Sequence, residues 1–206
     1  MYMPPFEKLE THNKEEVLKT INSTKRKMIM LKRKMEHPFY KEQERFCPSD
    51  LTIYKCDRGF LERAIMHYIS LGGAYKESLS ETRDRLFNEK LSQIKKITLV
   101  SGGYFSPRKK VVVDLSCDKP RYFSGIIYEL FERECELTKQ EFLSQLESLH
   151  IGEWRKTYTP ERFGVSVLDG EEWELNIEYS DGKKAKYCGQ NAYPYNYEEL
   201  IGLLDM

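Results

Sequence analysis

The sequence predicts an α+β fold: N-terminal helices, one of them long, precede antiparallel β-meanders with an intervening helix and a short C-terminal helix. Up to about residue 94, apolar side chains recur at helical spacing, whereas from residue 97 short β-branched and aromatic runs alternate with Gly- and Pro-containing turns. Hydrophobic residues make up 40% of the 206 residues and charged residues 32%, a composition that suits a packed core. We expect a helical arm over residues 1–46 and an α+β domain over 47–206, helical to about 94 and sheet-forming over 95–206.

The first helix is predicted from Lys14 to Glu36. Asn13 is placed to cap it, acidic residues follow in its first turn, and Pro38 stops it. Its apolar residues recur every seven positions, in two interleaved rows with one polar gap. These rows form a seam that consists of Val17, Ile21, Thr24, Met28, Leu31 and Met35.

Two further helices are predicted before the sheet begins. Residues 37–50 contain two prolines and are interpreted as a connection. Residues 57–71 then show an apolar helical face that ends at Gly72-Gly73, and residues 80–94 keep helical spacing.

A hairpin is predicted next, from strand-like residues 97–100 and 110–115. Residues 122–131 are rich in Ile, Tyr and Phe, which favours a strand, with a helix as the alternative. Thr138 and Glu141 have the spacing of a capping box and open a helix that runs to about Leu149.

The last third is predicted to form a second meander and a closing helix. Asp169-Gly170 joins strand-like residues 163–168 to 173–179, and Asp181-Gly182 joins the latter to 184–188. Such Asp-Gly pairs supply the positive φ of a two-residue hairpin. Residues 197–204 form a short helix.

Residues 94–206 carry a pattern of aromatic, glycine and asparagine positions. They comprise Trp154, Tyr158, Asp169, Gly170, Trp173, Gly189, Asn191, Tyr193 and Pro194, with Gly102-Gly103-Tyr104-Phe105 in the hairpin upstream. This pattern resembles that of a broad group of uncharacterised bacterial proteins, mostly from Firmicutes. The resemblance implies a shared fold and no particular activity.

Composition excludes several classes of protein. No apolar run approaches the roughly 18 residues of a membrane span, and the N-terminus does not resemble a signal peptide, so a cytoplasmic location without membrane association is expected. The five cysteines are scattered without a C-x-x-C pair, which predicts reduced thiols and neither a metal site nor a cofactor.

No catalytic motif is found. Glu174, Asn176 and Glu178 alternate onto one strand face near Glu171-Glu172, a row that suits acid–base work or a divalent metal, but the wet face of a half-exposed strand is the favoured interpretation. Cys–His pairing is unsupported by spacing, and Ser101-Gly102-Gly103 lacks the phosphate-loop pattern. We therefore expect a protein that is not an enzyme.

Protein binding is the predicted function, in a regulator, an inhibitor or an immunity-type factor. The seam predicts a homodimer or a captured partner helix, and the C-terminal tyrosines are suited to an interface or to the core. The predicted partner-binding residues are Ile21, Met28, Leu31, Met35, Tyr193 and Tyr195.

Nucleic-acid binding is the alternative. Two basic triplets lie seven residues apart on the first helix, and such clusters attract phosphates without reading sequence. The residues concerned are Lys25, Arg26, Lys27, Lys32, Arg33 and Lys34. Residues 1–120 carry a net charge of +8 and residues 121–206 one of −8, so the two stretches either attract each other within the fold or meet a charged partner.

Overall fold

The chain folds as two compact units, residues Met1–Glu77 and Ser78–Met206, in a computed structural model that describes residues 9–40, 48–103, 107–133, 136–167 and 169–204. The α+β class and the order of helices before strands are confirmed. The expected boundary near residue 46 falls inside the first unit, because the long helix packs against the helix that follows it. Tyr104, Phe105, Leu168, Cys47 and Cys135 lie outside the described residues.

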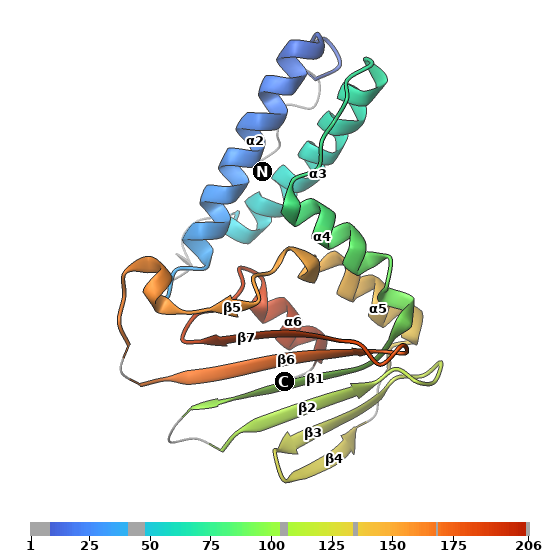
Figure 1. Cartoon of the computed structure of the whole chain (residues 1–206), viewed down its shortest axis with the longest axis vertical. Coiled ribbons are helices and arrows are strands. Elements are labelled where there is room, and N and C mark those ends of the chain that lie inside the picture. Colours follow the sequence, from blue (N-terminus) through green and yellow to red (C-terminus); the bar gives the residue numbers. More distant parts are fainter. Residues whose placement is uncertain (1–8, 41–47, 104–106, 134–135, 168, 205–206) are drawn as a thin grey trace. The chain divides into compact units, whose positions relative to one another are not determined.

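The first unit is built on two helices that lie side by side, α2 (Lys14–Met35) and α3 (Asp50–Ser70) (Figure 1). They run antiparallel: Lys14 Nζ donates to Gly72 O at one end, and Lys34 pairs with Asp50 at the other. The predicted cap is confirmed, since the Asn13 side chain accepts from the backbone N–H groups of two residues in the first turn. The predicted stop of α3 is confirmed too, with Gly72 at φ 75°.

Helix α3 begins seven residues before its predicted start. The Ser49 hydroxyl accepts from the backbone N–H of Thr52 and so provides an N-cap, directly after Pro48. The Pro-Ser-Asp sequence that suggested a loop is therefore the helix start. Proline before a capping serine marks a helix boundary as readily as a turn, so composition alone did not separate them.

The second unit contains a sheet with helices. Its helices are α4 (Leu79–Asn88), α5 (Lys139–Ser148) and α6 (Tyr197–Leu204), with 3₁₀ turns η1 (Leu91–Gln93), η2 (Ile151–Glu153) and η3 (Pro160–Phe163). Its strands are β1 (Ile94–Gly103), β2 (Lys109–Asp114), β3 (Arg121–Ile126), β4 (Glu129–Arg133), β5 (Thr157–Tyr158), β6 (Glu171–Tyr179) and β7 (Lys184–Gln190).

The described strands form one sheet in the order β4-β3-β2-β1-β6-β7-β5. The two predicted meanders are joined because β1 pairs antiparallel with β6, with Ile97 opposite Ile177 and Leu99 opposite Leu175. Strand β5 pairs parallel with β7, which sequence reasoning missed. Strands β1 and β6 are far apart in the chain, but each carries apolar residues on one face. By pairing, the two strands bury these residues on the same face of the sheet, so the two meanders form one sheet.

Several segments differ from their predicted form. The helix predicted over residues 80–94 ends at Asn88, and its last residues belong to η1 and to the start of β1. Residues 122–131 are strand, as favoured, but a tight turn divides them into β3 and β4. The predicted strand over residues 163–168 is wrong. Pro160 opens the 3₁₀ turn η3, which includes Phe163, and residues 164–167 belong to no strand. Gly182 has the expected positive φ of 82°, whereas Gly170 is not in that conformation.

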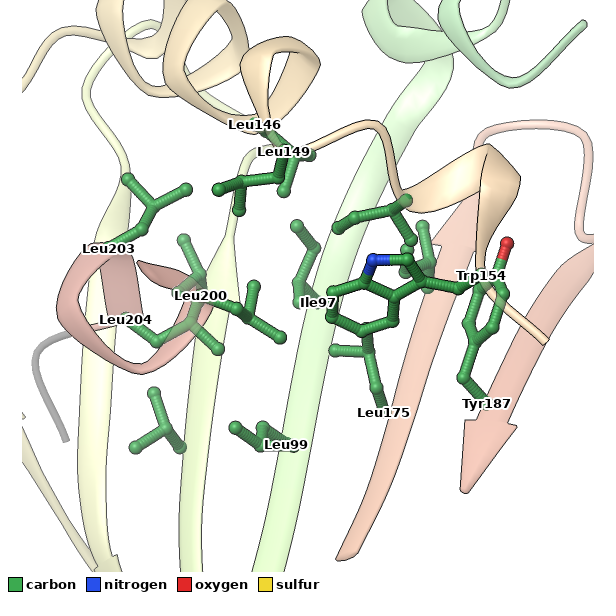
Figure 2. Packing of buried hydrophobic residues seen from close by; sticks show 14 of the residues in the cluster. Ile97, Leu99, Leu146, Leu149, Trp154, Leu175, Tyr187, Leu200, Leu203 and Leu204 are labelled. Carbon is green, nitrogen blue, oxygen red and sulfur yellow. The ribbon is translucent and has the colours of Figure 1, made fainter. Parts of the chain in front are cut away.

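The core of the second unit lies on one face of the sheet, beneath α5 and α6 (Figure 2). Leu146 and Leu149 come from α5, and Leu200, Leu203 and Leu204 from α6. They pack over the strand residues Ile97, Leu99 and Leu175, beside Trp154 and Tyr187 (Figure 2). Eight of these ten side chains are at most 3% exposed, so this face supplies the main hydrophobic stabilisation.

The opposite face of the sheet is mainly polar and partly exposed to solvent. Strand alternation places Lys96, Thr98 and Val100 there, opposite the Glu178, Asn176 and Glu174 of β6. Among the described residues, no helix has the length and apolar character needed to cross a membrane.

Candidate functional site

The predicted seam lies between α2 and α3. Ile21, Met28 and Met35 are buried, and Leu31 is half-buried. Tyr54, Phe60, Leu61, Ala64 and Tyr68 form the buried face of α3 that packs in the same unit. The seam is therefore occupied by the chain's own helix, which corrects its assignment as a surface for a partner. A heptad pattern identifies a helix-packing face without telling which helix will cover it.

The basic triplets are partly engaged inside the first unit. Lys27 pairs with the buried Asp57 at 2.8 Å, Lys34 pairs with Asp50 at 2.7 Å, and Lys25 lies 4.7 Å from the ring centre of Tyr75. Lys32 is half-buried, and Arg26 and Arg33 are exposed. Lys25, Lys27 and Lys34 thus contact other residues of the first unit, whereas Arg26 and Arg33 are exposed.

The row of carboxylates on the wet face of β6 is ion-paired. Glu174 lies 2.6 Å from Lys186, and Glu178 contacts both Lys96 and Lys184. Hydrogen bonds from Lys186 lower the pKa of Glu174, and one from Lys96 lowers that of Glu178. A general acid needs a raised pKa, so this row is better suited to cross-strand pairing. Across the described residues, no group of three His, Cys, Asp or Glu side chains is placed to hold a metal ion.

Within the described part of the chain, the cysteine and histidine placements offer no nucleophile with an adjacent base. The described cysteines, Cys56, Cys117 and Cys188, are free thiols. Cys188 Sγ lies 3.8 Å from the backbone oxygen of Lys156, and His150 Nδ1 lies 2.6 Å from Asp84 Oδ2. A carboxylate, not a thiol, is the partner of that histidine.

The two C-terminal tyrosines have different environments. Tyr195 is 9% exposed and belongs to the interior, so its assignment to a partner surface is wrong. Tyr193 is half-buried, and its hydroxyl donates to Glu171 Oε2 at 3.0 Å. Burial, and then this hydrogen bond, raise the pKa of the Tyr193 phenol, which keeps it protonated.

Tyr193 belongs to a layer of aromatic rings at one end of the sheet. Its ring stacks on Trp173 at 6.4 Å and lies 4.8 Å from Tyr197, which in turn lies 5.0 Å from Trp173. These separations suit offset aromatic pairs. The rings come from three elements: β6, the segment after β7, and the start of α6.

The Gly-x-Asn pattern positions this layer. A Cβ at Gly189 would collide with the Trp173 indole, so glycine allows the ring to cross β7. Asn191, at φ 49°, accepts from the backbone N–H of Glu171 and donates to Asp169 O. Asparagine tolerates this left-handed conformation, so it can tie the end of β7 to the turn that opens β6.

A cavity of about 500 Å³ opens beside the aromatic layer, and we call it the acidic groove. Its aromatic wall is Trp173, Tyr193 and Tyr197. Its other lining residues are Ser101, Gly102, Pro107, Lys109, Ile126, Glu171, Glu172, Glu198 and Ile201. The volume lies within the range of ligand-binding clefts.

The charge in the acidic groove is predominantly negative. Glu172 pairs with Arg108 at 2.9 Å, but Glu171 and Glu198 form no ion pair with another described residue. Lys109 is the one cation among the lining residues. Carboxylates beside tyrosine and tryptophan rings attract cations through both charge and the faces of the rings.

Sequence reasoning identified Tyr193 as a binding residue and singled out Trp173 and Glu171-Glu172 for other reasons, but it did not place them in one groove. Glu198 and Ile201 project from α6, whereas Lys109 and Ile126 come from β2 and β3. The acidic pair Glu198-Glu199, directly after the tyrosine-rich segment, was the available signal. The strand contributions depend on register, which a single sequence does not reveal.

Comparisons with protein-family models, with curated proteins and with solved structures found no match to this chain.

Proposed function

We propose that this chain is a non-enzymatic protein-binding module, a regulator, inhibitor or immunity-type factor that docks on a partner through the acidic groove. The observation that supports this proposal is that three glutamates and a wall of aromatic rings line one cavity of about 500 Å³. Trp173 and Tyr197 are buried in the core, so the half-buried Tyr193 is the ring that a partner can contact. Tyrosine is favoured at the energetic centres of protein interfaces, because it buries a large area with few rotatable bonds.

The chemistry of the groove favours a partner segment that presents a lysine or arginine. The ammonium or guanidinium would pair with Glu171 and Glu198, and the aliphatic stem would lie against Ile126 and Ile201. A cation over the tyrosine face adds about 0.5–2 kcal/mol in such settings. A second copy of this chain is the homodimer version of the same proposal.

Nucleic-acid binding by α2 is the second candidate, because Arg26 and Arg33 are exposed. Lys27 and Lys34 pair with Asp57 and Asp50, which lowers the charge available to phosphates. Affinity of this kind would fall steeply as salt is raised.

The deciding experiment is affinity capture from lysate of the source cells, with and without nuclease, read by quantitative mass spectrometry. The bait proteins are the wild type, Glu198→Lys and the control Glu147→Lys. Glu198 and Glu147 are both exposed helix residues, but Glu147 does not line the groove. We expect a protein captured in stoichiometric amount despite nuclease, and lost at least about tenfold with Glu198→Lys, since reversing one charge costs more than about 1.4 kcal/mol at a desolvated pair.

Capture that is equal for Glu198→Lys and the wild type would contradict docking through the groove. Nucleic acid in the untreated sample, with no protein left after nuclease, would favour α2 instead; charge reversal at Arg26 and Arg33 would then abolish capture. Light scattering of the purified protein separates the homodimer version, which Glu198→Lys should convert to monomer.

A further inference from the structure

A second cavity, of about 320 Å³, lies in the second unit between α4 and the hairpin of β6 and β7. Helix α4 supplies Arg83, Leu86 and Phe87, and Lys90 follows its end. The turn η2 approaches α4 at Gly152, where an added Cβ would clash with the backbone of Asp84. The hairpin supplies Tyr179, Asp181, Lys183, Lys184, Ala185 and Tyr187. Trp154 and Lys156, which follow η2, complete the lining.

Five of these lining side chains are cationic and one is a carboxylate, so we call this cavity the basic pocket. Its cations are Arg83, Lys90, Lys156, Lys183 and Lys184. Lys183 is neutralised by Asp181 at 3.0 Å, and Lys184 lies 3.2 Å from Glu178. The other three cations have no ion-pair partner among the residues that the structure describes.

Arg83 and Lys156 are held without a neutralising charge, and Lys90 has only the longer-range attraction of Asp181, whose pKa it helps to lower. Arg83 donates to the backbone oxygen of Glu153 at 3.4 Å, and Lys156 Nζ lies 3.9 Å from the centre of the Tyr187 ring. Partial burial, and then repulsion from Arg83, lower the pKa of Lys156. Cations that repel one another around a concave surface are stabilised when an anion enters between them.

We propose that the basic pocket binds a small phosphorylated molecule. A phosphate group concentrates up to two negative charges on a compact set of acceptor oxygens, which matches one guanidinium and two ammonium groups around a space of about 320 Å³. The cations surround one cavity instead of following a track, so a small ligand fits better than a nucleic-acid strand, which is bound along extended basic grooves.

The test is isothermal titration calorimetry of the full-length protein with inorganic pyrophosphate at low salt. We expect one saturable site whose affinity falls as salt is raised, because the interaction is electrostatic. Lys156→Met keeps a long, flexible aliphatic side chain at this position and removes the charge that lies over the Tyr187 ring. Together with Arg83→Gln, it should weaken binding at least about tenfold, since each substitution removes a charge-assisted hydrogen bond to the phosphate oxygens.

Lys119→Gln is the matched control, because Lys119 is exposed on a turn and does not line the pocket. It should bind pyrophosphate like the wild type, as should Glu198→Lys in the acidic groove, so the two proposals fail independently. Melting curves check that every variant folds. Arg83 is exposed and Lys156 is only partly buried at the surface, so their substitution leaves the core intact.

Three results would overturn the proposal. The first is an absence of pyrophosphate binding up to about 10 mM, which means a binding free energy weaker than about 3 kcal/mol. The second is binding that the Arg83 and Lys156 substitutions leave unchanged. The third is displacement of pyrophosphate by a short single-stranded DNA at far lower concentration, which would make a nucleic acid the ligand.

Discussion

Trp154 and Trp173 each donate their single indole N–H to a buried acceptor. Trp173 Nε1 donates to Ala192 O at 2.9 Å, and Trp154 Nε1 to Asn196 Oδ1 at 3.0 Å. The Asn196 amide donates in turn to Leu149 O at 2.7 Å, so a side chain 2% exposed is satisfied on both sides. These bonds tie the segment after β7 to the sheet and to the end of α5.

Gly189→Ala is expected to destabilise the second unit by about 1–3 kcal/mol, the usual cost of an overpacked interior. The added methyl would meet the Trp173 indole and lie 2.6 Å from Ala192 O, so the aromatic layer would have to shift. Urea denaturation followed by tryptophan fluorescence measures the change. Both tryptophans lie in this unit, so the signal reports on it directly.

Gly202→Ala is the control for this substitution. Gly202 lies within α6 with no neighbouring atom within 4 Å of an added Cβ. We expect stability unchanged or raised by about 0.4–1 kcal/mol, because alanine favours a helix and restricts the unfolded chain. Equal destabilisation by both substitutions would show that the Trp173 crossing is not what requires Gly189.

At the scale of elements, α2 and α3 stabilise each other through a mixed interface. Val17 and Ala64 are fully buried, but Thr24 and Asp57 are buried as well. Lys27 donates to Asp57 Oδ1 at 2.9 Å, which offsets the burial of that carboxylate. Such a polar contact fixes which residues face one another along an otherwise apolar seam.

Met28→Ala is expected to lower the local stability of α2 by about 2–4 kcal/mol, because Met28 is buried in the seam at 7% exposure. Met30→Ala, with 73% of the side chain exposed, should change it by less than about 0.5 kcal/mol. Hydrogen exchange of the α2 amides measures both. If Met28→Ala leaves α2 protection intact and instead abolishes self-association, the seam serves a second copy.

Glu178 gives the sheet a pH-dependent contribution. Its folded pKa is lowered, first by the hydrogen bond from Lys96, below the ordinary value of 4.5. Its contribution to stability is therefore fully present above about pH 4.5 and is lost as pH falls through the folded pKa. Glu178→Gln should reduce stability at neutral pH by up to about 1 kcal/mol.

The difference between Glu178→Gln and the wild type should vanish near pH 3. Urea denaturation at the two pH values measures this, with Glu147→Gln as an exposed control that forms no ion pair among the described residues. A difference that persists in acid would attribute the effect to packing and not to charge.

At the scale of the whole molecule, part of the charge imbalance along the sequence is balanced by ion pairs inside the second unit. Lys96 lies on β1 and Arg108 directly precedes β2, and their acidic partners lie on β6. Lys96 pairs with Glu178 at 3.1 Å, and Arg108 with Glu172 at 2.9 Å. The expectation that the two stretches attract each other is thus supported by cross-strand neighbours.

Local patterns in the sequence were sufficient to predict most elements. The capping box at Thr138, the turn at Gly182 and the helix over residues 197–204 follow from short-range rules, and all three are present. The pairing of β1 with β6 and the parallel strand β5 join residues far apart in the chain, so periodicity could not reveal them. The candidate sites could not be predicted for the same reason, since both cavities contain residues from three or more elements.

The two ends of the sheet are protected by different means. Strand β5 covers part of β7 with a parallel pair at Thr157 and Tyr158. At the other end, β4 is a strand of five residues in which Glu129, Glu132 and Arg133 carry charge. Short length and charged side chains both disfavour the addition of a further strand at a sheet edge, so the exposed Phe131 does not by itself make β4 a template for aggregation. The sheet can thus keep an exposed aromatic residue at its margin without recruiting further copies into fibres.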